Sequence, residues 1–118
     1  MRIRMNRLQF NDVIRKYENQ NFISKDLFQE LKEEVEKSNI KVVVLDDDPT
    51  GVQTVHDIYV YTNWSYKSIL EGFTDENPLF FILTNSRSMT KDETIKAHQE
   101  IGRNIIKASK ETGKKFMI

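Results

Sequence analysis

The sequence predicts an α/β fold, in which a Rossmann-like, mostly parallel sheet is flanked by helices. Two observations support this prediction. Continuous apolar runs of strand length occur at residues 40–45 and 78–83, and amphipathic helical patterns alternate with the strand-like segments. Strands that alternate with helices are joined by crossover connections, which produce a parallel sheet covered by helices.

A helical leader is expected before the sheet, over residues 1–39. Residues 6–18 show a short amphipathic pattern. Ser24 is a typical N-cap, and helical spacing continues after it until about residue 39 through four apolar residues: Leu27, Phe28, Leu31 and Val35. The domain itself is therefore expected over residues 40–118.

Four segments of that domain are expected to form strands: residues 40–45, 57–62, 78–83 and a segment that begins at residue 115. The first is a run of β-branched and apolar residues bounded by a turn. Such a run has the length and composition of a strand that is covered on both faces.

Two helices are expected between these strands. The first spans residues 65–72, with a serine cap at its start and Gly72 at its end. The second begins at Thr90, where Glu93 completes a capping box, and ends at Gly113. Its buried stripe is expected to contain Ile95, His98, Ile101, Ile105 and Ala108.

The bulk composition excludes several functional classes. The chain has 118 residues and a formal net charge of zero, with 18 basic and 18 acidic residues. No basic excess favours binding to nucleic acid or to a membrane surface. Cysteine is absent, and neither a secretory signal nor a membrane-spanning run is present. We expect a cytoplasmic protein.

The segment "GKKFMI" ends the sequence just as a new apolar run begins. A short edge strand that closes the domain would explain it. A chain that forms the front part of a longer protein would explain it better, so the domain is expected to be incomplete.

Three consecutive aspartates follow the first apolar run in "VVVLDDDPTG". Neighbouring carboxylates repel one another unless a cation, N–H groups or ligand hydroxyls compensate their charge. Residues 46–51, the aspartate loop, also contain Thr50 as a hydroxyl donor and Gly51 as a point of close approach. A solvated turn with Asx caps is the simpler interpretation, but three aspartates exceed what a turn requires. We expect Asp46, Asp47, Asp48, Thr50 and Gly51 to bind a ligand.

A second polar segment, "TNSRS", follows the apolar run at residues 78–83. We call residues 84–88 the arginine loop. Arg87 offers a planar fork that suits a carboxylate or phosphate, and Asn85 and Ser86 add small polar groups. Arg87 could instead pair with an aspartate. Because ligands bind at the carboxyl ends of parallel strands, we expect the two loops to be neighbours that share one site.

Other motifs are less informative. His56 follows the aspartate loop, where a surface position is as plausible as a place in the site. With four glycines and neither a G-x-x-x-x-G-K-[ST] nor a G-x-G-x-x-G pattern, the chain is expected to contain no cofactor-binding residues. Metal ligands remain open.

The pattern Asp-x-Asp-x-Thr after an apolar strand resembles motif I of the haloacid dehalogenase-like phosphotransferases. That resemblance implies a magnesium-dependent phosphatase with Asp46 as nucleophile and Asp48 as acid/base, and with Thr84 as the threonine of motif II. Pro49 departs from the glycine that usually follows the second aspartate.

A longer match points to another family. The run "DDDPTGVQTVHD" at residues 46–57, together with "NSR" at residues 85–87, closely resembles the four-carbon acid sugar kinase family, formerly a domain of unknown function. The resemblance covers roughly residues 41–118 and is that of the N-terminal domain. Two separate motifs make it more specific than Asp-x-Asp-x-Thr alone.

This resemblance implies the substrate-binding portion of an ATP-dependent kinase that phosphorylates four-carbon sugar acids, such as threonate, erythronate or oxo-tetronate, at the terminal hydroxyl. Asp47 and Asp48 would be catalytic, and the ligand-binding residues of both loops would hold the sugar acid. ATP and Mg²⁺ would be bound mainly by a C-terminal kinase domain, which this chain lacks. The chain alone is expected to show little or no turnover, and a homo-oligomer is possible. A non-catalytic binding module remains the third alternative.

Overall fold

The computed structural model describes residues 9, 11, 15 and 25–118. The helix predicted over residues 6–18 therefore lies largely outside the described residues. Residues Val35–Ile118 form one compact unit, which contains the whole sheet. The predicted domain boundary between residues 39 and 40 stays a prediction.

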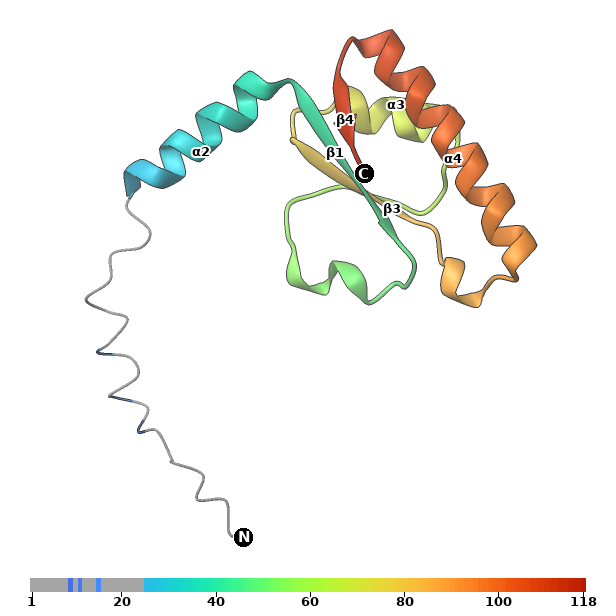
Figure 1. The fold of residues 1–118 in the computed structure, drawn as a ribbon, viewed down its shortest axis with the longest axis horizontal. Helices are drawn as coiled ribbons and strands as arrows, with labels where there is room; N and C mark the ends of the chain where they lie inside the picture. The colour runs from blue at the N-terminus through green and yellow to red at the C-terminus, as the bar shows by residue number, and fades with distance from the viewer. Residues whose placement is uncertain (1–8, 10, 12–14, 16–24) are drawn as a thin grey trace, which may run out of the picture. The chain divides into compact units, whose positions relative to one another are not determined.

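The sheet has four parallel strands in the order β2-β3-β1-β4, which confirms the predicted α/β fold (Figure 1). The strands are β1 (Ile40–Asp46), β2 (Val60–Tyr61), β3 (Leu79–Leu83) and β4 (Lys115–Met117). The two central strands, β1 and β3, pair from Val42↔Leu79 to Asp46↔Leu83. Their carboxyl ends consequently lie side by side.

The strand predicted over residues 57–62 is much shorter in the structure, where β2 contains only Val60 and Tyr61. Asp57 has a φ of 58°, a left-handed backbone conformation that does not belong to a strand. The Tyr59 carbonyl still accepts a hydrogen bond of 3.0 Å from the Phe81 N–H. The edge strand β2 therefore begins only after the backbone turn at Asp57.

Three helices are described: α2 (Lys25–Ser38), α3 (Tyr66–Thr74) and α4 (Lys91–Thr112). The capping box of α4 is confirmed, because the Thr90 side chain accepts from the Glu93 N–H and the Glu93 carboxylate accepts from the Thr90 N–H. Gly113 ends this helix in the left-handed region, at a φ of 68°. Within the described residues, no helix is both long and apolar enough to cross a membrane.

The prediction that Gly72 ends its helix was wrong, since α3 continues to Thr74. Gly72 is buried within the helix, against the Phe80 ring of β3. An added Cβ would lie only 2.8 Å from two carbons of that ring. Glycine is present here because it allows close packing of helix on sheet.

One hydrophobic core joins α3 and α4 to the same face of the sheet. Its buried members are Val43, Ile69, Phe73, Phe80, Ile82, Ile101, Ile105 and Ala108. Right-handed crossovers explain this arrangement, because both connections run in the same direction across the strand order.

One residue of the predicted stripe on α4 was placed wrongly: Ile95 is 44% exposed, and Ala97 is buried instead. Six residues separate Ile95 from Ile101, which places Ile95 about 120° around the helix from that residue. His98 is half-buried, with Nδ1 2.9 Å from the Thr94 carbonyl oxygen.

The expectation that β1 is covered on both faces was also wrong for the compact unit of residues 35–118. Val43 is fully buried on the helix-covered face, whereas Val42 and Val44 on the other face are only half-buried. Their partners Leu79 and Phe81 in β3 are half-buried as well. Both crossover helices lie on the opposite face, so these side chains receive no cover from α3 or α4.

Lys41 is a buried charged residue at the amino edge of the sheet, with 3% of its surface exposed. Its ammonium group donates to the Asp75 carbonyl at 2.6 Å and to the Asn77 carbonyl. Burial, followed by repulsion from Lys114, lowers the pKa of Lys41. The lysine ties the turn after α3 to β1.

The two glycines inside helices provide a matched test of this packing. Gly72→Ala is expected to destabilise the protein by about 1–3 kcal/mol, because its methyl group would overlap the Phe80 ring. Gly102→Ala in α4 meets no atom within 4 Å and should stabilise the protein by about 0.5–1 kcal/mol through helix propensity. Urea unfolding of both variants measures the difference. Equal effects of the two substitutions would contradict the packing argument.

Candidate functional site

The aspartate loop and the arginine loop meet at the carboxyl edge of the sheet, as the sequence predicted. They follow the two central strands, and Thr84 joins them directly. Its N–H and its hydroxyl both donate to the Asp46 carbonyl, at 2.8 and 3.0 Å. Thr84 is only 1% exposed, so this connection is protected from water. Sequence reasoning counted Thr84 as a small polar group of the arginine loop and, by resemblance, as the threonine of a phosphatase motif, and it missed this role.

Arg87 joins the loops a second time. Its Nε and Nη2 donate to the two carboxylate oxygens of Asp47, each at 3.2 Å, and its Nη1 donates to Asp48 Oδ2 at 3.1 Å. The Arg87 N–H also donates to the Asp47 carbonyl at 3.3 Å. Hydrogen bonding and attraction from Asp47 raise the pKa of Arg87, so the guanidinium remains charged. The pairing with aspartate that the sequence left open is present.

Asp48 is held from within its own loop. Its Oδ1 accepts the Thr50 hydroxyl at 2.6 Å and the Thr50 N–H at 2.9 Å. These bonds, the hydroxyl bond first, lower the pKa of Asp48 below its ordinary value. Asp48 is therefore kept ionised, and both of its oxygens have partners.

Asp46 differs from its neighbours because it is buried, with 8% of its surface exposed. Its Oδ1 accepts the Asp48 N–H at 3.2 Å, while its Oδ2 is enclosed and has no hydrogen-bond partner among the described residues. Gly51 lies directly against this carboxylate, and a Cβ at Gly51 would be 2.4 Å from Oδ2. Asp46 Oδ2 is therefore closed off from solvent, whereas the side chains of Asp47 and Asp48 are more exposed.

Asn85 and Ser86 shape the arginine loop. Asn85 has a left-handed backbone with a φ of 51°, a conformation that asparagine tolerates better than most residues. The Ser86 and Thr84 hydroxyl oxygens lie 3.1 Å apart. A short 3-10 turn, Ser86–Ser88, follows and brings Arg87 back toward the aspartates. The Asn85 side chain is exposed at this edge of the sheet.

The cluster thus combines three carboxylates with one guanidinium. Carboxylate oxygens with free lone pairs accept hydrogen bonds from hydroxyl groups, and each oxygen can accept more than one. The Asp47 side chain is 53% exposed and the Asp48 side chain 26% exposed, so both are open to a small polyhydroxyl molecule. The Asx-type bonds at Asp46 and Asp48 show that the aspartates also stabilise the turn.

The described residues contain neither a cluster of metal-ligating side chains nor a glycine-rich phosphate-binding motif. Among them, no group of three or more His, Cys, Asp or Glu side chains is arranged to hold a metal ion. No glycine-rich phosphate-binding pattern is present in the sequence. His56 is not part of this cluster. Its side chain is 92% exposed, and its Nδ1 lies 2.8 Å from Asp57 Oδ2.

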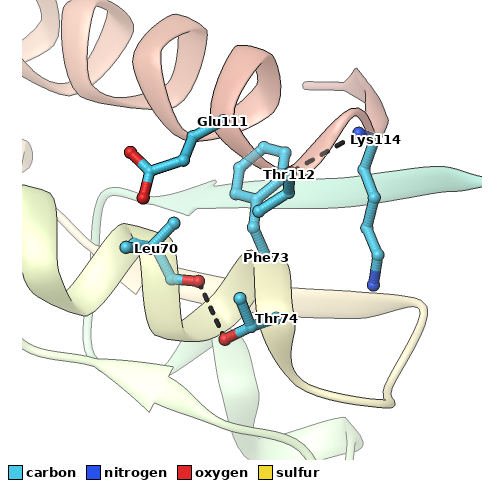
Figure 2. A pocket seen from close by; sticks show the side chains of 6 residues that line it. All are labelled: Leu70, Phe73, Thr74, Glu111, Thr112 and Lys114. Atoms are coloured by element: carbon cyan, nitrogen blue, oxygen red, sulfur yellow. Dashed lines mark hydrogen bonds between the residues drawn. The ribbon is translucent and has the colours of Figure 1, made fainter.

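A cavity of about 400 Å³ lies elsewhere, between the carboxyl-terminal ends of α3 and α4 (Figure 2). It is lined by Leu70, Phe73, Thr74, Glu111, Thr112 and Lys114. Because α3 and α4 end just before β3 and β4 begin, this cavity is at the amino edge of the sheet. Parallel sheets bind ligands at the opposite, carboxyl edge, so we place the candidate site at the two loops.

Comparison with known families identifies the chain. The family model described as the sugar-binding N-terminal domain matches residues 42–118, which include both loops and all four strands except the first residues of β1. The chain belongs to this family. The resemblance to the N-terminal domain of the four-carbon acid sugar kinases is thereby confirmed. No curated protein and no solved structure gave a match.

Membership of a sugar-binding family agrees with the chemistry of the cluster, and a small sugar is the kind of ligand that it fits. Sugars present several hydroxyl donors, and the aspartate loop presents several carboxylate acceptors.

The pKa of Asp48 tests the geometry of the aspartate loop. Thr50→Val removes the hydroxyl donor but keeps the backbone N–H, so it should raise the pKa of Asp48 part of the way to its ordinary value. Because the folded-state pKa is depressed, the stabilisation by this carboxylate is present above the unfolded-state pKa and is lost as the pH falls through the folded-state pKa. Carboxyl-carbon NMR titration measures the change. Thr74→Val, at the other edge of the sheet, should leave Asp48 unaffected.

Proposed function

We propose that this chain supplies the substrate-binding loops of an ATP-dependent kinase that phosphorylates four-carbon sugar acids at the terminal hydroxyl. The observation that carries the proposal is the cluster of Asp46, Asp47, Asp48 and Arg87 at the carboxyl ends of two adjacent parallel strands. Family membership supports sugar binding, and the motifs "DDDPTG" and "NSR" support this branch of kinases.

In this proposal, Asp47 and Asp48 accept hydrogen bonds from the hydroxyl groups of the sugar acid. A carboxylate close to the attacking hydroxyl orients it and receives its proton as the phosphoryl group is transferred. Both side chains are more exposed than Asp46, which suits contact with a ligand. Asp46, Thr50 and Gly51 then shape the loop from beneath, while Asn85, Ser86 and Arg87 border the site from the neighbouring strand.

ATP and Mg²⁺ are proposed as the cofactors of the complete kinase, bound mainly by a separate C-terminal domain. The described residues contain no group of three or more metal-ligating side chains and no glycine-rich phosphate-binding pattern, so the part assigned to this chain is to hold and orient the sugar acid and to receive the proton of its attacking hydroxyl. Turnover would then require that C-terminal domain as a partner.

A panel of ligands tests the proposed substrate class. Thermal unfolding of the chain should shift upward with one of threonate, erythronate or a 2-oxo-tetronate, since a ligand that binds only the folded state stabilises it. ATP should cause no shift. Stabilisation by magnesium with a phosphate mimic, and none by any sugar acid, would favour a phosphatase instead.

Single substitutions locate the binding site. Asp47→Asn and Asp48→Asn should each weaken sugar-acid binding by about tenfold or more, because hydrogen bonds to a charged acceptor are stronger than those to a neutral one. Asp75→Asn, at the amino edge of the sheet, is the matched control and should leave affinity unchanged. Calorimetric titration gives the dissociation constants. Unaltered affinity in both loop variants would place the ligand elsewhere.

A further inference from the structure

Three of the five N–H donors of the Arg87 guanidinium are already engaged by the protein's own carboxylates. Its Nε and Nη2 face the two oxygens of Asp47 in a bidentate pair, and its Nη1 reaches Asp48. The main chain repeats the contact, since the Arg87 N–H donates to the Asp47 carbonyl. Arg87 therefore contacts Asp47 through both its backbone and its side chain, and these contacts connect the arginine loop to the aspartate loop.

The charges of the cluster also argue against a substrate carboxylate bound at Arg87. Three carboxylates and one guanidinium form the cluster, and the three N–H groups of Arg87 that make bonds all donate to aspartates. A substrate carboxylate bound at the same edge of the guanidinium would have to displace Asp47 or Asp48. The displaced aspartates would then lie beside a further negative charge, and like charges at such distances oppose binding. A hydroxyl group meets no such penalty, because it donates to the aspartates in place.

We propose that Arg87 is a positioning residue: it holds Asp47 and Asp48 in place to accept the hydroxyl end of the substrate, whose carboxylate lies beyond the reach of Arg87. This inference rests on the proposed function and deepens it, because it fixes which end of the sugar acid faces the two loops. It differs from the expectation that the Arg87 fork binds the substrate's carboxylate.

The test compares a charged and an uncharged ligand of the same carbon chain. Calorimetric titration with threonate and with the polyol threitol gives two dissociation constants for each variant. Arg87→Gln should weaken binding of both ligands by the same factor, about tenfold or more, because it releases the aspartates that both ligands contact. Arg87→Lys keeps the charge but not the fork, and should weaken both ligands equally and by less.

A selective loss of threonate binding in Arg87→Gln would overturn the inference, since it would show that the guanidinium binds the carboxylate. Unchanged affinity for both ligands would overturn it as well, while leaving the proposed function intact. Failure of the unmodified chain to bind either ligand would overturn the proposed function, and this inference with it. Lys91→Gln is the matched control: it removes an exposed positive charge at the start of α4 and should alter neither affinity.

A second readout needs no ligand. Arg87→Gln should move the carboxyl-carbon NMR signals of Asp47 and Asp48 in the free protein, whereas Lys91→Gln should not. Thermal unfolding of Arg87→Gln is expected to remain cooperative, because the Arg87 side chain is 66% exposed and lies outside the core. Unmoved aspartate signals in the folded variant would also overturn the positioning role.

Discussion

The parallel pairing of β1 with β3 is the constraint on which the candidate site depends. It sets Asp46 opposite Leu83 and so brings two polar loops to one edge of the sheet, where residues 38 to 40 positions apart in sequence form hydrogen bonds. Thr84, which is only 1% exposed, then connects the two loops through two hydrogen bonds to the Asp46 carbonyl. Without this pairing the three aspartates would have no guanidinium beside them.

The core below the site explains why that edge is held firmly. Val43, Phe80 and Ile82 come from the same two strands and pack against α3 and α4 as one cluster. Gly72 permits this packing by allowing α3 to lie directly on the Phe80 ring. The strands that present the loops are thus the most buried elements of the compact unit, whereas the loops themselves are exposed enough to meet a ligand.

Within the site, similar residues have different tasks because their environments differ. Asp46 is enclosed beneath Gly51 and shapes the turn, whereas Asp47 and Asp48 are turned outward and paired with Arg87. Exposed ion pairs contribute little to stability. In the proposed positioning role of Arg87, its pairs hold two carboxylates of like charge, Asp47 and Asp48, at fixed positions.

The sequence by itself determined the α/β class, both ends of α4 and the meeting of the two loops, because these follow from local periodicity, capping chemistry and the rule that parallel strands end at one edge. The sequence analysis predicted too long a strand β2, ended α3 too early at Gly72 and placed Ile95 wrongly on the buried face of α4. The length of β2, the end of α3 and the burial of Ile95 all depend on contacts with residues that are distant in sequence. Only the tertiary structure decided the strand order, the burial of Asp46 and the pairing of Arg87. These depend on which segments become neighbours in space, and local patterns do not encode that.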